Sequence, residues 1–175
     1  TRTPIMFRWP GTIPAANRSE LASSIDLVPT MLAAAGAGGP HKFPGLNLLE
    51  HLKSGEVIER DAIFGESFAH DIADIENPQE SLLYRWVIKG NHKLLLTYDG
   101  RPGRMKYPPR EAAPQLYDLK SDPLEKQNLA AKNPERVAEL SKLLEAWYVP
   151  TQRQVNKVGS AQSNRQPRKK RPGKD

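Results

Sequence analysis

Cysteine is absent from the 175 residues, and so is any long hydrophobic run. Without cysteine the chain can hold no disulfide, no thiolate metal site and no cysteine nucleophile, although this absence says little about its cellular compartment. No stretch reaches the roughly 18 apolar residues of a membrane-spanning helix, so we expect a soluble chain without a transmembrane segment. The first residues, TRTPIMFRWPG, also lack the charged start and apolar middle of a signal peptide. A hydrophobic content of 38% suits one modest domain of about 100 to 150 residues.

The net charge of +6 is concentrated at the C-terminal end. Residues 151–175 hold eight Lys/Arg and one acidic residue, whereas residues 1–150 are close to neutral. This end has no apolar periodicity and repeats Pro and Gly, which predicts a disordered basic tail. The tail could bind an anionic polymer or a membrane surface, or it could be solvated with no specific partner. We favour the second interpretation, and expect no specific nucleic-acid partner, because charge alone rarely specifies one.

The first 58 residues predict a strand and a helix joined by loops. The run PIMFRW, residues 4–9, is mostly apolar and ends at Pro10-Gly11, as a buried strand followed by a turn would. A helix over about residues 25–36 follows, with Asp26 as its N-cap and Pro29 in its first turn. Its expected apolar stripe consists of Leu27, Met31, Leu32 and Ala35.

Residues 59–150 predict an antiparallel sheet covered by a helix. The runs AIFGESF, SLLYRWVIKG and HKLLLTYDG are rich in strand-forming residues, and Gly90-Asn91 suits a two-residue hairpin turn. PQLYDL adds a further strand, and Asn133-Pro134 begins a helix over residues 134–149. The apolar face of that helix consists of Val137, Leu140, Leu144 and Trp147. The fold class is therefore α+β, with a four-stranded antiparallel sheet and the last helix packed across one face.

Three stretches together resemble one known family. TRTPIMFRWPGTIP, SSIDLVPTMLAAAG and YRWVIKGNHKLLL with QLYDLKSDPLEKQNLA look like the C-terminal third of a type I sulfatase, of the arylsulfatase and polysaccharide-sulfatase kind within the alkaline-phosphatase superfamily. The resemblance covers roughly residues 1–150 and leaves out the tail. It implies that residues 1–58 are a strand-helix remnant of the large α/β sulfatase domain, and that residues 59–150 are the C-terminal subdomain.

The resemblance also implies an activity. Type I sulfatases hydrolyse sulfate esters with a formylglycine made from the first residue of a Cys/Ser-x-Pro-x-Arg motif, beside a calcium ion that stabilises charge on the sulfate. The substrate would be a sulfated small molecule or polysaccharide, and the location extracytoplasmic: periplasmic, secreted or lysosome-like. The family's nucleophile and metal ligands lie upstream of the matching stretches. The expected partner of this chain is therefore a missing N-terminal catalytic portion.

The formylglycine motif can be searched for directly. Without cysteine only a serine could begin it, and Pro123 alone among the prolines has a serine two residues before it, Ser121. The residue two positions after Pro123 is Glu125 instead of arginine, so the motif is absent. We therefore expect no catalytic and no metal residue in this chain, no bound calcium or formylglycine, and no activity of the chain alone. The alternative function is a non-catalytic module that binds anionic polymers through its basic tail.

A few local residues could still lie at the rim of a substrate pocket. His70 and Arg85 are the two candidates, because loops of this region cover the pocket in sulfatases that resemble this chain. The acidic residues Asp71, Asp74 and Glu76 are more simply a solvated loop, since a calcium loop usually supplies more oxygen ligands and a glycine turn. The segment YDLKSDPLEKQNL has a sufficient structural explanation, because aspartates can bond turn amides.

Overall fold

The computed structural model describes residues 3–37, 39, 42–70, 74–98 and 111–148. Contacts within the chain divide it into two compact units, Thr1–Ile63 with Ile88–Gly90 and Phe64–Val87 with Asn91–Asp175. Among the described residues no helix combines the length and the apolar character needed to cross a membrane. The tail expected at 151–175 lies outside the described residues.

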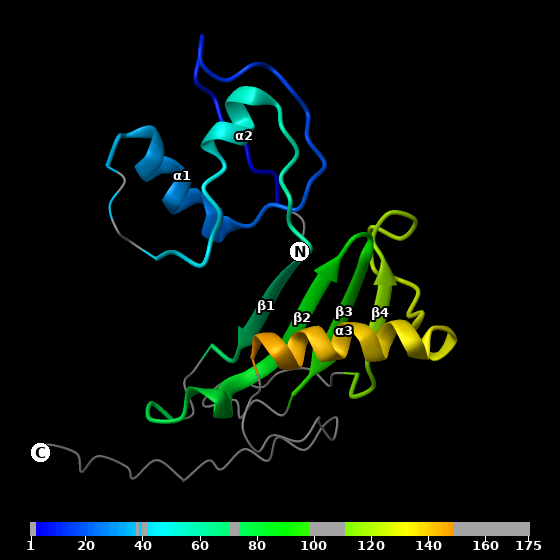
Figure 1. Cartoon of the computed structure of the whole chain (residues 1–175). Helices are drawn as coiled ribbons and strands as arrows, with labels where there is room; N and C mark the ends of the chain where they lie inside the picture. Colours follow the sequence, from blue (N-terminus) through cyan, green and yellow to red (C-terminus); the bar gives the residue numbers. More distant parts are fainter. Residues whose placement is uncertain (1–2, 38, 40–41, 71–73, 99–110, 149–175) are drawn as a thin grey trace, which may run out of the picture. The chain divides into compact units, whose positions relative to one another are not determined.

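The first unit contains three short helical segments (Figure 1). The 3-10 helix η1, Ser24–Asp26, leads directly into α1, Leu27–Ala34, in the region of the expected helix. The helix α2, Leu49–Ser54, ends at Gly55, whose φ of 82° is the left-handed conformation that closes many helices.

The segment predicted as strand 4–9 has no regular secondary structure. A strand is stabilised by backbone pairing with a neighbour, and none of the described strands pairs with this segment. The turn predicted after it does form, because the amides of Thr12 and Ile13 donate to the Trp9 carbonyl at 3.1 and 2.9 Å. Gly11 takes a φ of 74° in that turn, which only glycine adopts easily.

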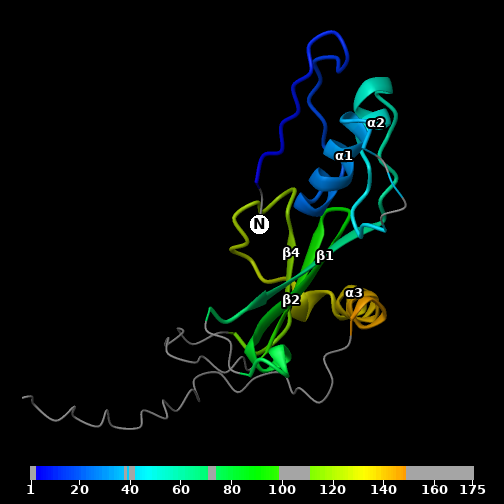
Figure 2. The same ribbon diagram turned by 90° about the vertical axis from the view of Figure 1, so that its left-hand side faces the viewer.

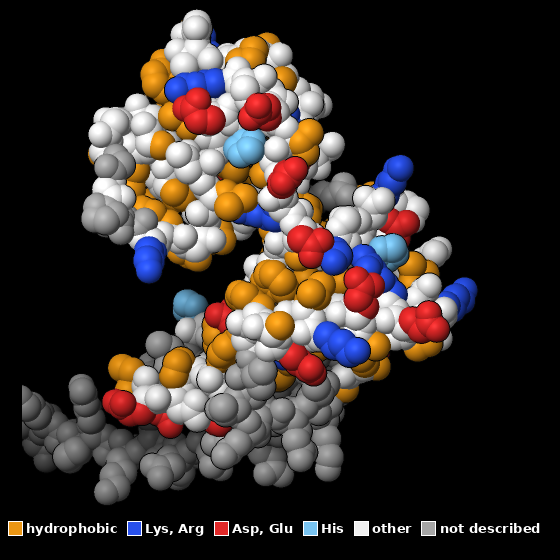
Figure 3. All heavy atoms as spheres, viewed as in Figure 1, with side chains coloured by type: hydrophobic (Ala, Val, Ile, Leu, Met, Phe, Trp, Pro, Cys, Tyr) orange, Lys and Arg blue, Asp and Glu red, His pale blue; other side chains and the backbone are white. Residues whose placement is uncertain are grey.

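The apolar stripe predicted on α1 is not buried. Met31 is 58% exposed, Ala35 is exposed, and Leu27 and Leu32 are half-buried. The one buried residue of α1 is Thr30, whose hydroxyl donates to the Asp26 carbonyl at 2.6 Å and accepts the Leu48 amide at 2.9 Å. The loop before α2 therefore packs against the polar side of α1, and the apolar side is left at the surface of this unit (Figure 3).

Four strands form the sheet that the sequence predicts. They are β1 Ala62–Phe68, β2 Leu82–Lys89, β3 His92–Thr97 and β4 Gln115–Asp118, in the spatial order β1-β2-β3-β4. The chain reverses direction between successive strands, so neighbouring strands are antiparallel. After β1 the Ala69 amide donates to the Ser81 carbonyl at 2.6 Å, and Leu94 on β3 pairs with Leu116 on β4. In the turn between β2 and β3 Gly90 has a φ of 58°, while Asn91 stays at negative φ.

The helix α3, Pro134–Trp147, lies across one face of the sheet (Figure 2). Leu140 and Leu144 are fully buried, and so are Leu94 on β3 and Leu116 on β4. The spacing of apolar residues thus predicted the buried side of this helix correctly as far as Leu144. At the C-terminal end Trp147 remains 43% exposed.

Candidate functional site

The two predicted rim residues lie in different environments. His70 is exposed just after β1, next to the buried Ala69. Arg85 lies in the middle of β2 and is only 3% exposed. A residue buried to this extent can influence a rim only through the groups that it holds in place.

The guanidinium of Arg85 joins the sheet to the end of α3. Its Nε and Nη2 donate to the Tyr98 hydroxyl at 2.8 and 2.5 Å, and it lies over the Tyr98 ring at 5.2 Å. Its Nη1 donates to the carbonyls of Leu144, at 3.2 Å, and of Tyr148. Because a helix C-terminus carries partial negative charge, a cation at this place stabilises α3. Arg85 is thus a positioning residue for Tyr148 and the end of the helix.

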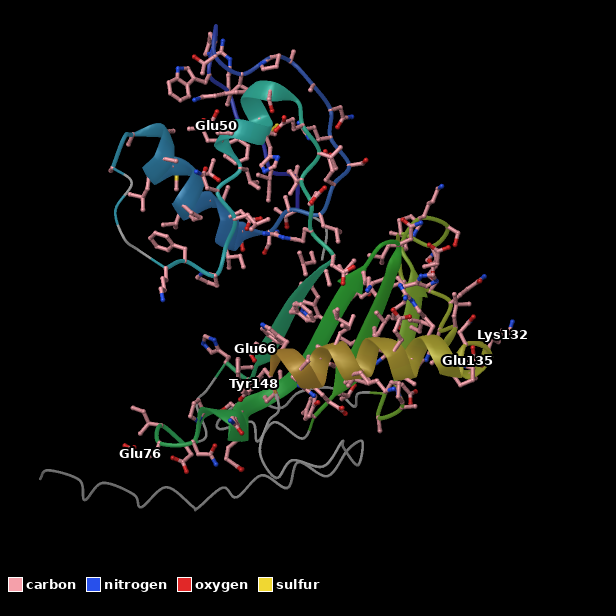
Figure 4. The ribbon with its side chains drawn as sticks, viewed as in Figure 1. Glu50, Glu66, Glu76, Lys132, Glu135 and Tyr148 are labelled. Carbon is pink, nitrogen blue, oxygen red and sulfur yellow. The ribbon has the colours of Figure 1, made fainter. Side chains whose placement is uncertain are left out.

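Beside Arg85, β1 contributes a carboxylate and an aromatic ring. The ring of Phe64 stacks on that of Trp147, with 5.2 Å between centroids and 14° between planes, and Tyr148 meets Trp147 edge-on at 6.1 Å. Glu66 lies on the same face of β1, two residues after Phe64, and is exposed. Figure 4 labels Glu66 on the strand and Tyr148 after the helix.

The charge of Glu66 depends on these surroundings. Although Glu66 is exposed overall, partial desolvation of its carboxyl by the surrounding protein raises its pKa, and the nearby charge of Arg85 opposes this rise only in part. On the opposite face of β1, a side chain at Gly65 would meet the Trp86 ring at 2.2 Å, so glycine is required there for the ring to lie against the strand. The alternation in AIFGESF could have pointed to Phe64 and Glu66 as one face, but nothing in the sequence indicated that Trp147 would reach them.

A second polar cluster lies in the first unit, around Asp26. This carboxylate is fully buried and receives two hydrogen bonds from Arg60, at 2.6 and 2.7 Å. It also accepts the amides of Ser23, at 2.7 Å, and Leu46, at 2.8 Å. The predicted N-cap role is therefore wrong for α1: no side-chain cap bond is made to that helix, because the carboxylate turns to Arg60 and the two amides. Four donors on one carboxylate form a structural clasp that joins three segments, and they leave little capacity for a ligand.

The pKa of Asp26 reflects this set of donors. Burial alone would raise it, but the hydrogen bonds from Arg60 and the two backbone amides outweigh burial and hold the pKa below its ordinary value. Gly45 lies beside the clasp, where an added side chain would meet the Ile25 carbonyl at 2.1 Å. No local pattern indicated a role for Arg60, since its partner Asp26 is 34 positions away.

The described residues of the first unit also form a surface hollow of about 530 Å³. It is lined by Leu46, Asn47, His51, Glu56, Val57 and Glu59. The backbone beneath is held by Arg18, which donates to the carbonyls of His51 at 2.9 Å and Glu56 at 2.5 Å. Arg18 therefore ties together the loop segments that line this hollow.

The segment YDLKSDPLEKQNLA is a turn held by its own side chains, as predicted. Asp122 accepts the amides of Lys126 and Gln127, both at 2.7 Å. Asp118 accepts the Lys120 amide at 2.9 Å and the Ser121 hydroxyl, and these hydrogen bonds hold the pKa of Asp118 below its ordinary range. In addition the Asn128 side chain accepts the Leu116 amide at 3.0 Å, which ties the loop to β4.

A calcium site does not fit the residues that the structure describes. No three His, Cys, Asp or Glu side chains of this part come close enough together to hold a metal ion. In the acidic loop Asp74 instead accepts the amides of Glu76 and Asn77, at 3.0 and 3.3 Å. Asp71 lies outside the described residues.

Comparison with known proteins identifies the family. The family model of the C-terminal part of N-sulphoglucosamine sulphohydrolase matches residues 1–152. The chain belongs to this family of sulfatase C-terminal domains. Among curated sulfatases, it is 29% identical over 153 residues to an N-acetylgalactosamine-6-O-sulfatase of Bacteroides thetaiotaomicron, which covers 83% of this chain and 27% of the relative. It is 30% identical over 139 residues to human arylsulfatase K, covering 75% of this chain and 23% of the relative.

Solved structures agree on the sulfatase fold. A protein of the glycosaminoglycan metabolism of B. thetaiotaomicron matches with a TM-score of 0.57 at 24% identity, over 76% of this chain and 28% of its own. The protein Ps i-CgsB, also solved with k-i-k-neocarrahexaose, matches with a TM-score of 0.55 at 22% identity, over 79% of this chain and 27% of its own. The sulfatase chain therefore spans about a quarter of the length of the proteins that it resembles.

Proposed function

We propose that this chain is the C-terminal subdomain of a longer sulfatase that hydrolyses sulfate esters of saccharides, and that the chemistry is carried by an N-terminal catalytic portion. One observation carries the proposal: the family match extends over residues 1–152, yet the sequence contains neither a cysteine nor a Ser-x-Pro-x-Arg motif. Attack on a sulfate, which is already anionic, requires an activated oxygen nucleophile and a cation on the sulfate oxygens. The formylglycine and the calcium ion would both belong to the N-terminal portion.

The exposed side of α1 supports a role for such a partner. Ile25, Val28 and Met31 are 49%, 46% and 58% exposed, and their spacing of three places them along one side of the helical segment. Exposed apolar side chains gathered in this way are typical of surfaces that pack against another part of a protein. This side of α1 would pack against the N-terminal portion.

The saccharide substrate is proposed from the chemistry of the relatives. One is described as an N-acetylgalactosamine-6-O-sulfatase and another as an ulvan-active sulfatase. His70 would lie at the rim of the pocket, and Arg85 would support that rim from below by holding Tyr148. An extracytoplasmic location is proposed on the same family basis.

The decisive experiment compares two proteins in the same assay. The 175-residue chain should show no turnover of a chromogenic aryl sulfate, with or without added calcium. The same chain preceded by its native upstream sequence, and produced together with a formylglycine-generating enzyme, should turn the substrate over. The matched control is the longer protein with alanine at the first position of its Cys/Ser-x-Pro-x-Arg motif, which should be inactive. Activity in the 175 residues alone, or an active control, would refute the proposal.

A further inference from the structure

The face of β1 next to α3 presents a partly exposed aromatic surface. Phe64, Glu66 and Phe68 alternate along the strand, so their side chains share this face. Trp147 extends the face by stacking on Phe64 at 5.2 Å. Trp147 is 43% exposed and Phe68 40% exposed. We call these three aromatic residues together with Glu66 the aromatic platform.

The carboxylate in the platform decides what kind of molecule fits it. Glu66 is exposed, and no described residue donates a hydrogen bond to its side chain. A purely apolar protein segment laid over the platform would bury this carboxylate without a donor, which is unfavourable. A sugar ring suits it better, because its C–H face packs on an aromatic ring while its hydroxyl groups donate to a carboxylate.

We propose that the aromatic platform binds one sugar ring of a saccharide, with the ring against Trp147 and a pair of its hydroxyl groups toward Glu66. The inference deepens the proposed function, on which it rests for the substrate being a saccharide. The indole of Trp147 is held in a fixed orientation, because Phe64 stacks on one of its faces and the Tyr148 ring meets it edge-on at 6.1 Å. Arg85 fixes Tyr148 through its backbone carbonyl, so the geometry of the platform is set from the core.

The charge of the platform also determines where a sulfate can be. A carboxylate repels a sulfate group, so the ring on the platform must present hydroxyl groups toward Glu66. Binding should therefore tolerate sulfate elsewhere on the saccharide and be lost when sulfate occupies the hydroxyls that face Glu66. This discrimination separates the platform from a general attraction of polyanions to the basic end of the chain.

Nuclear magnetic resonance of the full chain tests the proposal. The probe is a tetrasaccharide of alternating hexosamine and uronic acid with one 6-O-sulfate per hexosamine, titrated to about 10 mM. We expect saturable shifts of the Trp147 indole N–H and of the Glu66 amide, and none at Trp9. Phe68→Ala and Trp147→Leu should each weaken binding about tenfold, while Trp147→Phe, which keeps an aromatic ring, should stay within about threefold of the parent. Glu66→Gln should relax the exclusion of fully sulfated tetrasaccharide.

Three results would overturn the proposal. These are the absence of a saturable shift at Trp147, an affinity read at the Glu66 amide that is unchanged in Trp147→Leu, and a Trp147 indole that no longer responds in the longer protein because another segment covers it. Since Phe68 belongs to β1 and not to α3, its variant keeps the test valid if Trp147→Leu disturbs the helix end. Sugar binding without turnover by the longer protein would refute the proposed function alone, and turnover without binding here would refute only the platform.

Discussion

Two of the buried charged side chains among the described residues, Asp26 and Arg85, join segments that are far apart in sequence. Asp26 is fully buried and bonds to Arg60 and to the amides of Ser23 and Leu46. Arg85 is 3% exposed and bonds to Tyr98 and to the end of α3. Transfer of a charge from water to a protein interior is costly, so such groups persist only where opposite charge and donors or acceptors replace the water. In both places the replacement is nearly complete, which leaves either side chain little capacity to bind a ligand.

Asp26→Asn should destabilise the first unit strongly. The substitution keeps the size of the side chain but leaves Arg60, 9% exposed, without its counter-charge, and breaking a buried pair typically costs about 3 to 5 kcal/mol. Glu50→Gln is the matched control, because Glu50 is 75% exposed in its pair with Lys53 and should change stability by less than about 0.5 kcal/mol. Urea unfolding followed by circular dichroism measures both variants. Equal midpoints for the two would show that the clasp contributes little.

The same clasp predicts a pH dependence. The pKa of Asp26 lies below its ordinary value of 3.8, so its contribution to stability is fully present above that value and is lost as the pH falls through the folded-state pKa. In Asp26→Asn this acid-side loss should shrink, which a urea series between neutral and acidic pH would measure.

At the scale of elements, α3 is held by two fully buried leucines, Leu140 and Leu144. Leu144→Ala should lower the free energy of unfolding by about 2 to 5 kcal/mol, since it removes buried methyl groups and leaves a cavity against the sheet. Met31→Ala on α1 makes a comparable truncation at a side chain that is 58% exposed, and should cost less than about 0.5 kcal/mol in the isolated chain. Calorimetry and urea unfolding report the two values. A larger loss for Met31 than for Leu144 would mean that the buried sides of these helices are wrongly assigned.

These two helices also show what the sequence could and could not predict. The strands and α3 were predictable because their burial follows from alternation and from three-and-four spacing within one segment. The strand at 4–9 was wrongly predicted, because an apolar run indicates burial only if another segment pairs with it. The prediction that the apolar stripe of α1 is buried was wrong for a similar reason. The loop before α2 packs against Thr30 through a hydrogen bond from the Leu48 amide, which no local pattern reveals. For the candidate site, the rim role of Arg85 stays a prediction, and its contact with Tyr148, 63 positions away, could not be predicted from any local pattern.

At the scale of the whole molecule, the distribution of charge separates the folded body of the chain from the basic end that could bind an anionic polymer. The net charge of +6 comes from residues 151–175, and without them the remaining chain is close to neutral. We expect the second unit to fold without this end, because its described core lies between α3 and the sheet, where Leu94, Leu116, Leu140 and Leu144 are fully buried. The alternative function, a module that binds anionic polymers, depends on this end entirely.

Removal of residues 151–175 should therefore abolish retention on a sulfated polysaccharide column while leaving the urea midpoint unchanged. Attraction between a cationic segment and a polyanion comes largely from the release of counterions, and added salt weakens it and screens the charges. Elution of the full chain should therefore shift steeply with salt. A variant with the same 25 residues in scrambled order is the matched control, because charge without a specific sequence should bind equally well. If the scrambled end loses retention, the natural order encodes a specific site. If truncation lowers the midpoint, these residues pack on the fold, and the polymer-binding role would no longer be separable from folding.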